Sequence, residues 1–133
     1  MSAPVVSQTG EALLAAVSAA MVALHERYHH RAPVTAKTLF IGGEMIVCVL
    51  GGVYTDVEKT MIELQRTVIV QETRSAFQMA MQHKFVSVVE ALSGREVLAF
   101  MSNQHVGPDL EIEIFLLKPS VRPEDRLPIL GRA

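Results

Sequence analysis

The amino-acid sequence predicts an α+β fold with the element order helix, hairpin, helix, helix, hairpin. Three observations support this: helical spacing of apolar residues over residues 12–30, two strand-like runs joined by Gly42-Gly43, and a second succession of helices and strands over residues 55–118. We expect a four-stranded, mostly antiparallel sheet with helices packed on one face. Residues 1–118 make a single α+β domain in this prediction, and residues 119–133 a Pro-rich C-terminal tail.

Composition limits the possible functions. The 133 residues suffice for one domain, and half of them are hydrophobic while only 5% are aromatic, which predicts an aliphatic core. A net charge of -2 provides no field for gathering phosphates, so it argues against a nucleic-acid partner. The lone Cys48 cannot form an internal disulfide and is expected in the core, which fits a reducing, cytoplasmic setting.

The first helix is expected to be buried. Its uncharged stretch, residues 12–24, is too short to cross a bilayer core of about 30 Å, and no Lys or Arg precedes it to make a signal peptide. The domain's own sheet or the second subunit of a homodimer could cover it. The helix should end near His30, because Pro33 disfavours a helical conformation at Ala32. Steps of three and four predict an apolar seam of Leu14, Val17, Met21, Leu24 and Tyr28.

The first hairpin and the second helix follow from local signals. Gly42-Gly43 suits a tight primed turn, and the apolar run from Met45 to Leu50 predicts a central strand covered on both faces. Thr55 and Glu58 have the spacing of a capping box. We therefore interpret Glu58 as a helix cap rather than a catalytic acid.

The second helix should end near Leu64, and after a joint at 65–67 a longer helix should run to Leu92 and be closed by Gly94. Apolar spacing predicts that its inner stripe consists of Phe77, Met81, Phe85, Val88 and Leu92. Four polar residues are expected outside this stripe: Arg74, Gln78, Gln82 and Lys84.

The last two strands are predicted at Glu96–Met101 and Leu110–Leu117. Leu and Ile alternate with Glu111 and Glu113 in the final strand, which is the pattern of a strand with one face toward the core and one partly exposed to solvent. The polar residues 102–109 predict the longest loop, where function tends to lie. In the tail, Leu127, Ile129 and Leu130 could dock on a neighbour.

One motif suggests metal chemistry. His25-Glu26-Arg27-Tyr28-His29 matches H-E-x-x-H, in which two histidines one helical turn apart hold zinc and the glutamate activates water. A catalytic site needs a third ligand, and Pro33 interrupts the helix before one can follow. We expect a solvated helix end here and no metal or other cofactor, with His25, Glu26 and His29 as the alternative zinc site.

One further site hypothesis concerns the predicted loop at 102–109. Neither Gly pair has the spacing of a phosphate-binding loop. His105 and Asp109 could orient one another for proton transfer, but backbone bonding around Gly107-Pro108 is the simpler interpretation.

The chain also resembles a known family. The residues that carry the resemblance are Arg31-Ala32-Pro33, the hairpin 35–50, the run Gly52-Val53-Tyr54-Thr55-Asp56-Val57-Glu58-Lys59, Arg74, Phe77, Val89-Glu90-Ala91-Leu92-Ser93-Gly94, Val97, Ser102-Asn103-Gln104-His105-Val106-Gly107-Pro108-Asp109, Glu113 and Phe115. Over residues 10–119 the chain is similar to the bacterial MpsC family, component C of a membrane-potential-generating system. It departs from the family at His30-Arg31-Ala32-Pro33, where G-R-G-P is usual, and at Tyr54, where Leu is usual.

The resemblance implies a cytoplasmic accessory protein, with a peripheral position at the inner face of the membrane as an alternative. It implies a link to systems that generate a membrane potential or take up bicarbonate with cations. Our leading hypothesis is a non-enzymatic, homodimeric regulatory subunit that does not itself span the membrane, with Arg31, His105 and Asp109 as partner or ligand contacts. The alternatives are a small zinc-dependent hydrolase and a small-molecule sensor whose loop before Asp109 closes on its ligand.

Overall fold

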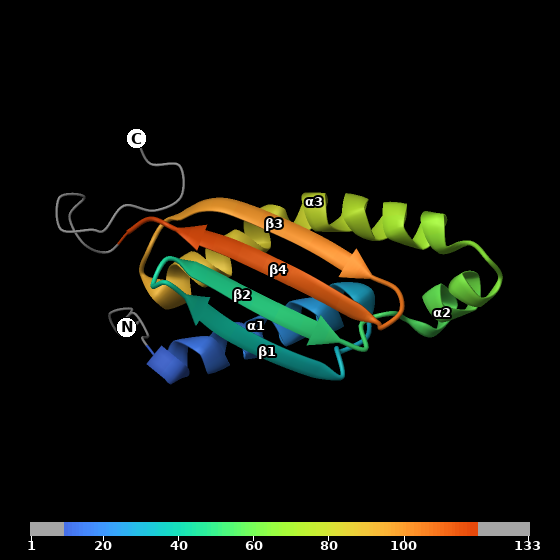
Figure 1. Cartoon of the computed structure of the whole chain (residues 1–133), viewed down its shortest axis with the longest axis horizontal. Coiled ribbons are helices and arrows are strands. Elements are labelled where there is room, and N and C mark those ends of the chain that lie inside the picture. The colour runs from blue at the N-terminus through green and yellow to red at the C-terminus, as the bar shows by residue number, and fades with distance from the viewer. Residues whose placement is uncertain (1–9, 120–133) are drawn as a thin grey trace.

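The computed structural model describes residues 10–119, which form three helices and four strands. The tail from residue 120, including Leu127, Ile129 and Leu130, lies outside the described residues. The predicted α+β fold and element order are confirmed (Figure 1). The elements are α1 (Gly10–His29), β1 (Thr35–Ile41), β2 (Met45–Gly51), α2 (Asp56–Glu63), α3 (Thr67–Ser93), β3 (Val97–His105) and β4 (Leu110–Leu117).

The four strands form one antiparallel sheet in the order β1-β2-β4-β3, so β2 and β4 occupy its centre. α1 and α3 cover one face of the sheet, and α2 lies beside the start of α3 at one end (Figure 1). Gly42 and Gly43 both take positive φ in the β1–β2 turn, as the sequence predicts. The core therefore lies between the two long helices and one face of the sheet.

The two long helices bury stripes other than those predicted. α1 buries Leu13, Val17, Met21 and His25, so only two members of the predicted seam are fully buried. On α3, Arg74 and Gln78 are fully buried although apolar spacing put them outside the stripe. Apolar periodicity missed these positions because their polar groups find partners inside the fold. The buried residues of α3 are Val70, Arg74, Gln78, Met81, Phe85, Val89 and Ser93.

Strand β4 turns its glutamates toward the core, whereas its alternating pattern suggested that its Leu and Ile residues would face inward. Glu111 and Glu113 are fully buried beneath the helices, while the intervening Ile112 and Ile114 lie on the open face. Within residues 10–119, β2 is also covered on one face alone and not on both as predicted, because α1 and α3 lie on the same side of the sheet. Pairing in register therefore places ten apolar side chains larger than alanine on the open face: Leu39, Ile41, Met45, Val47, Val49, Met101, Leu110, Ile112, Ile114 and Leu116.

The predicted functional loop at 102–109 is mostly strand. β3 continues to His105, and only residues 106–109 make the turn into β4. Ser102 pairs with Glu113 and Gln104 with Glu111, so these polar side chains share the helix-facing side with the two carboxyl groups. The polar composition of residues 102–105 suggested a loop, because the buried glutamates beside which Ser102 and Gln104 lie belong to another strand.

Candidate functional site

A network of polar side chains crosses the core between the sheet and the helices. Such burial is unusual, because a charge removed from water is costly unless it is paired. The network joins four elements through His25 of α1, Glu58 of α2, Arg74 and Gln78 of α3, and Glu111 and Glu113 of β4. A chain this small that keeps so many titratable groups in its core is a candidate for function at that place.

Arg74 connects the helices to the sheet. Its Nε and Nη2 donate to the Glu58 carboxylate at 2.7 and 2.5 Å, and Nη1 donates to Glu111 Oε1 at 3.3 Å. Nη2 also donates to the Val53 carbonyl at 2.7 Å. The Thr55–Glu58 capping box is confirmed, so Glu58 both caps α2 and neutralises Arg74. The Arg74 guanidinium therefore forms hydrogen bonds through all three of its nitrogens, which compensates for its burial, since only 1% of the residue is exposed.

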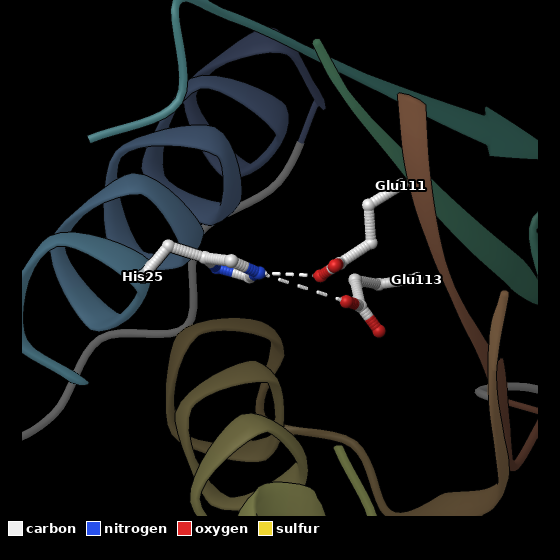
Figure 2. A group of neighbouring side chains, drawn as sticks. All are labelled: His25, Glu111 and Glu113. Atoms are coloured by element: carbon white, nitrogen blue, oxygen red, sulfur yellow. Dashed lines mark hydrogen bonds and ion pairs between the residues drawn. The ribbon is translucent and has the colours of Figure 1, made fainter. Parts of the chain in front are cut away.

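His25, Glu111 and Glu113 converge at the centre of the network (Figure 2). The imidazole Nε2 lies 2.5 Å from Glu111 Oε2 and 3.9 Å from Glu113 Oε1. The Gln78 amide donates to both carboxyl groups, at 2.8 Å for Glu113 Oε1. The alternation of β4 explains the pair, since residues two apart on a strand point to the same face.

The two carboxyl groups differ in protonation. Burial and the neighbouring Glu111 raise the pKa of Glu113 far above its usual range, so Glu113 keeps its proton at neutral pH. Burial also tends to raise the pKa of Glu111, but hydrogen bonds from His25 and Glu113 and the charges of His25 and Arg74 lower it overall. One carboxylate and one carboxylic acid therefore share this site.

The two histidines of H-E-x-x-H lie on one side of α1, with ring centroids 5.5 Å apart, and Glu26 lies on another. His25 is buried, which contradicts the expected solvated helix end, whereas Glu26 is exposed. The His29 ring packs on Phe77 at 4.0 Å between centroids. Burial, followed by the charges of Arg74 and His25, lowers the pKa of His29 to about 4. The motif thus supplies one residue, His25, to the buried network.

Arg31, His105 and Asp109 lie around one end of the sheet. Arg31 donates to the Gly52 carbonyl at 3.4 Å, and the Asp109 carboxylate accepts from the amides of Val53 and Tyr54. His105 is exposed, with Nδ1 3.0 Å from the Pro108 carbonyl. Both His105 and Asp109 thus bond to backbone groups, and the alternative pairing of one with the other is not among the contacts of either side chain within the described residues.

A hollow of about 190 Å³ opens between α3 and β3 beside the network. Gln78, Ser102 and Gln104 lie on its polar side, and Met79 and Phe100 add apolar surface. Gln78 and Ser102 both adjoin Glu113, so the hollow leads from solvent toward the buried carboxyl group.

Sequence analysis missed most of this site. Glu111 and Glu113 looked like the wet face of a strand, and Arg74 and Gln78 like the wet side of a helix. The available signal was the apolar character of the residues alternating with the two glutamates, which is compatible with either orientation of β4.

Comparison with known proteins identifies the family. The profile of the family described as "Na+-translocating membrane potential-generating system (MpsC)" matches residues 9–119. The chain belongs to the MpsC family. The resemblance noted from the sequence is thereby confirmed over most of the chain, and MpsC membership implies association with a membrane-potential-generating system. Neither a curated protein nor a solved structure matches this MpsC chain. None of the helices within residues 10–119 is long and apolar enough to cross a membrane.

Proposed function

We propose that the protein is a non-enzymatic accessory component of a membrane-potential-generating system and that it acts as a homodimer. Family membership supplies the context. The observation that carries the proposal is the open face of the sheet, whose ten apolar side chains are not covered by any described helix (Figure 1). Contiguous apolar surface of this kind marks an interaction site.

A second copy of the chain fits this face. Two twisted sheets pack face to face with their apolar side chains interdigitated. Four strands of about seven residues give a footprint of roughly 20 by 23 Å. This footprint, about 460 Å² before the relief of the side chains is counted, is more than half of the roughly 800 Å² that each partner buries in a standard interface. Lys37 on β1 and His105 on β3 lie near the margins, so the centre presents no charge that would call for an oppositely charged partner.

The oligomeric state tests the dimer. Light scattering coupled to size-exclusion chromatography should give twice the chain mass for the wild type and the single chain mass for Ile114→Glu. Ile114 pairs with Val47 and Met101 at the centre of the face. Ile69→Glu is the matched control, because Ile69 is 49% exposed on α3 away from the sheet. A monomeric wild type, or a dimer in Ile114→Glu, would contradict this interface.

The accessory role needs a separate test. Tagged protein retrieved from gently solubilised native membranes should bring down a multi-spanning transport protein of a cation or bicarbonate uptake system. Arg31 and His105, the partner contacts predicted at one end of the sheet, supply the variants: alanine at both positions should weaken capture while leaving the dimer intact. Recovery of the protein alone would count against an accessory role and leave the dimer test unaffected.

A further inference from the structure

We infer that His25, Glu111 and Glu113 form a binding site for one divalent transition-metal ion in the core, between α1 and β4. One ligand atom from each residue lies within 4.8 Å of the other two (Figure 2). An imidazole nitrogen with two carboxylate oxygens is a donor set typical of Zn²⁺, Mn²⁺ and Fe²⁺ sites. The site goes beyond the proposed accessory role and does not depend on it.

The hydrogen bond of His25 Nδ1 leaves Nε2 as the ring nitrogen that faces the two carboxyl groups. Nδ1 lies 2.8 Å from the Met21 carbonyl, which can only accept, so Nδ1 carries a hydrogen. Nε2 therefore faces Glu111 Oε2, 2.5 Å away, where the two atoms share a proton when no metal is bound. A divalent ion can replace that proton and bind Glu113 as well, and a backbone carbonyl on the other ring nitrogen is the usual support of a metal-binding histidine.

Neighbouring groups hold both carboxyl groups in place. The Gln78 amide donates to Glu111 and Glu113, and Arg74 donates to the other oxygen of Glu111. Arg74 adds a positive charge nearby, but the Glu58 carboxylate at 2.5 Å offsets it. The Glu111 carboxylate therefore remains available to bind a divalent ion, and Glu113 becomes a second anionic ligand by releasing its proton when the ion binds. Oriented carboxylates of this kind are what metal sites require.

Gln78 independently indicates a ligand. The residue is only 3% exposed, and its Oε1 has no hydrogen-bond partner within the described part of the chain. It also lines the hollow between α3 and β3, together with Ser102 and Gln104. The hollow gives an ion a polar route to Glu113, and the Gln78 side chain offers an amide oxygen as a further ligand if the amide rotates.

The test is metal titration of the full chain after removal of metals with a chelator. Calorimetry with Zn²⁺ and with Mn²⁺ should show one ion per chain for at least one of them, with a rise in melting temperature. Glu113→Gln and His25→Gln should each lower the affinity at least about tenfold. Glu26→Gln and His29→Gln are the matched controls, because they alter the H-E-x-x-H motif and spare the proposed ligands; they should bind like the wild type.

Circular dichroism of each metal-free variant establishes that it is folded before titration. If His25→Gln does not fold, Glu113→Gln decides, since glutamine has nearly the shape of the glutamic acid it replaces. Absence of binding by the wild type would overturn the proposal, as would unchanged affinity in folded Glu113→Gln. Equal loss in Glu26→Gln or His29→Gln would overturn it in favour of the motif itself.

Discussion

His25 and Glu111 lie 86 positions apart in sequence, yet their side chains meet at 2.5 Å in the core. This contact joins the inner stripe of α1 to the helix-facing side of β4. Because it is buried, the contact depends on the orientation of both elements at once. Shifting the alternation of β4 by one residue would move Glu111 to the open face and leave His25 without this partner.

Removal of Arg74 should destabilise the protein strongly. Arg74→Met keeps much of the side-chain volume but leaves Glu58 and Glu111 without their common cation. We expect a loss of about 3–5 kcal/mol in the free energy of unfolding, because an unpaired buried charge remains. Urea denaturation measures it. Arg66→Met, at an exposed position just before α3, is the control and should be nearly neutral. Comparable losses in the two variants would refute the role of Arg74.

Glu113 should make the metal-free protein less stable as pH rises. In the folded state Glu113 keeps its proton at pH values far above its ordinary pKa of 4.5, whereas in the unfolded chain it loses the proton near pH 4.5. The contribution is therefore complete below about pH 4.5 and is lost progressively above it. Glu113→Gln removes this slope, so its stability relative to wild type should increase from about pH 5 to about pH 9. Denaturation series with chelator present measure the difference, and a pH-independent difference would contradict the raised pKa.

His29 should make the protein sensitive to mild acid. Its pKa falls from 6.5 to about 4 in the folded state, mainly because of burial. Below pH 6.5 His29 binds a proton in the unfolded chain, but in the folded state it binds one only near pH 4. The free energy of unfolding therefore decreases over this interval as pH falls. His29→Phe keeps the ring against Phe77 and should reduce the loss. His83→Phe, at an exposed position, should leave the acid dependence of the melting temperature unchanged.

Gly52 should not tolerate a side chain. It has φ of +66°, and a Cβ there would lie 2.6 Å from Cγ2 of Val34. Gly52→Ala combines left-handed strain with this clash and should cost more than about 1 kcal/mol. Gly43→Ala is a close match, since Gly43 has φ of +71° with nothing near the added atom, and it measures strain alone. Chemical denaturation compares them; equal losses would show that the contact with Val34 is unimportant.

Local sequence signals were sufficient for the element order. The Thr55–Glu58 capping box, the Gly42-Gly43 turn and the Gly94 helix end each depend on a few consecutive residues, and the structure contains all three. Backbone conformation at such positions follows from residue type alone. The α+β class followed from the succession of these elements.

The candidate site was decided only by tertiary structure. The strand pattern of β4 allows either its glutamates or its aliphatic residues to face the helices. Arg74, His25 and Gln78 provide the charge and hydrogen bonds that make burial of Glu111 and Glu113 possible, and they come from helices distant in sequence. The sequence by itself therefore determined the elements and their order, because those depend on local conformational preference. Which faces are buried depended on pairing between distant polar groups, which no local pattern reports.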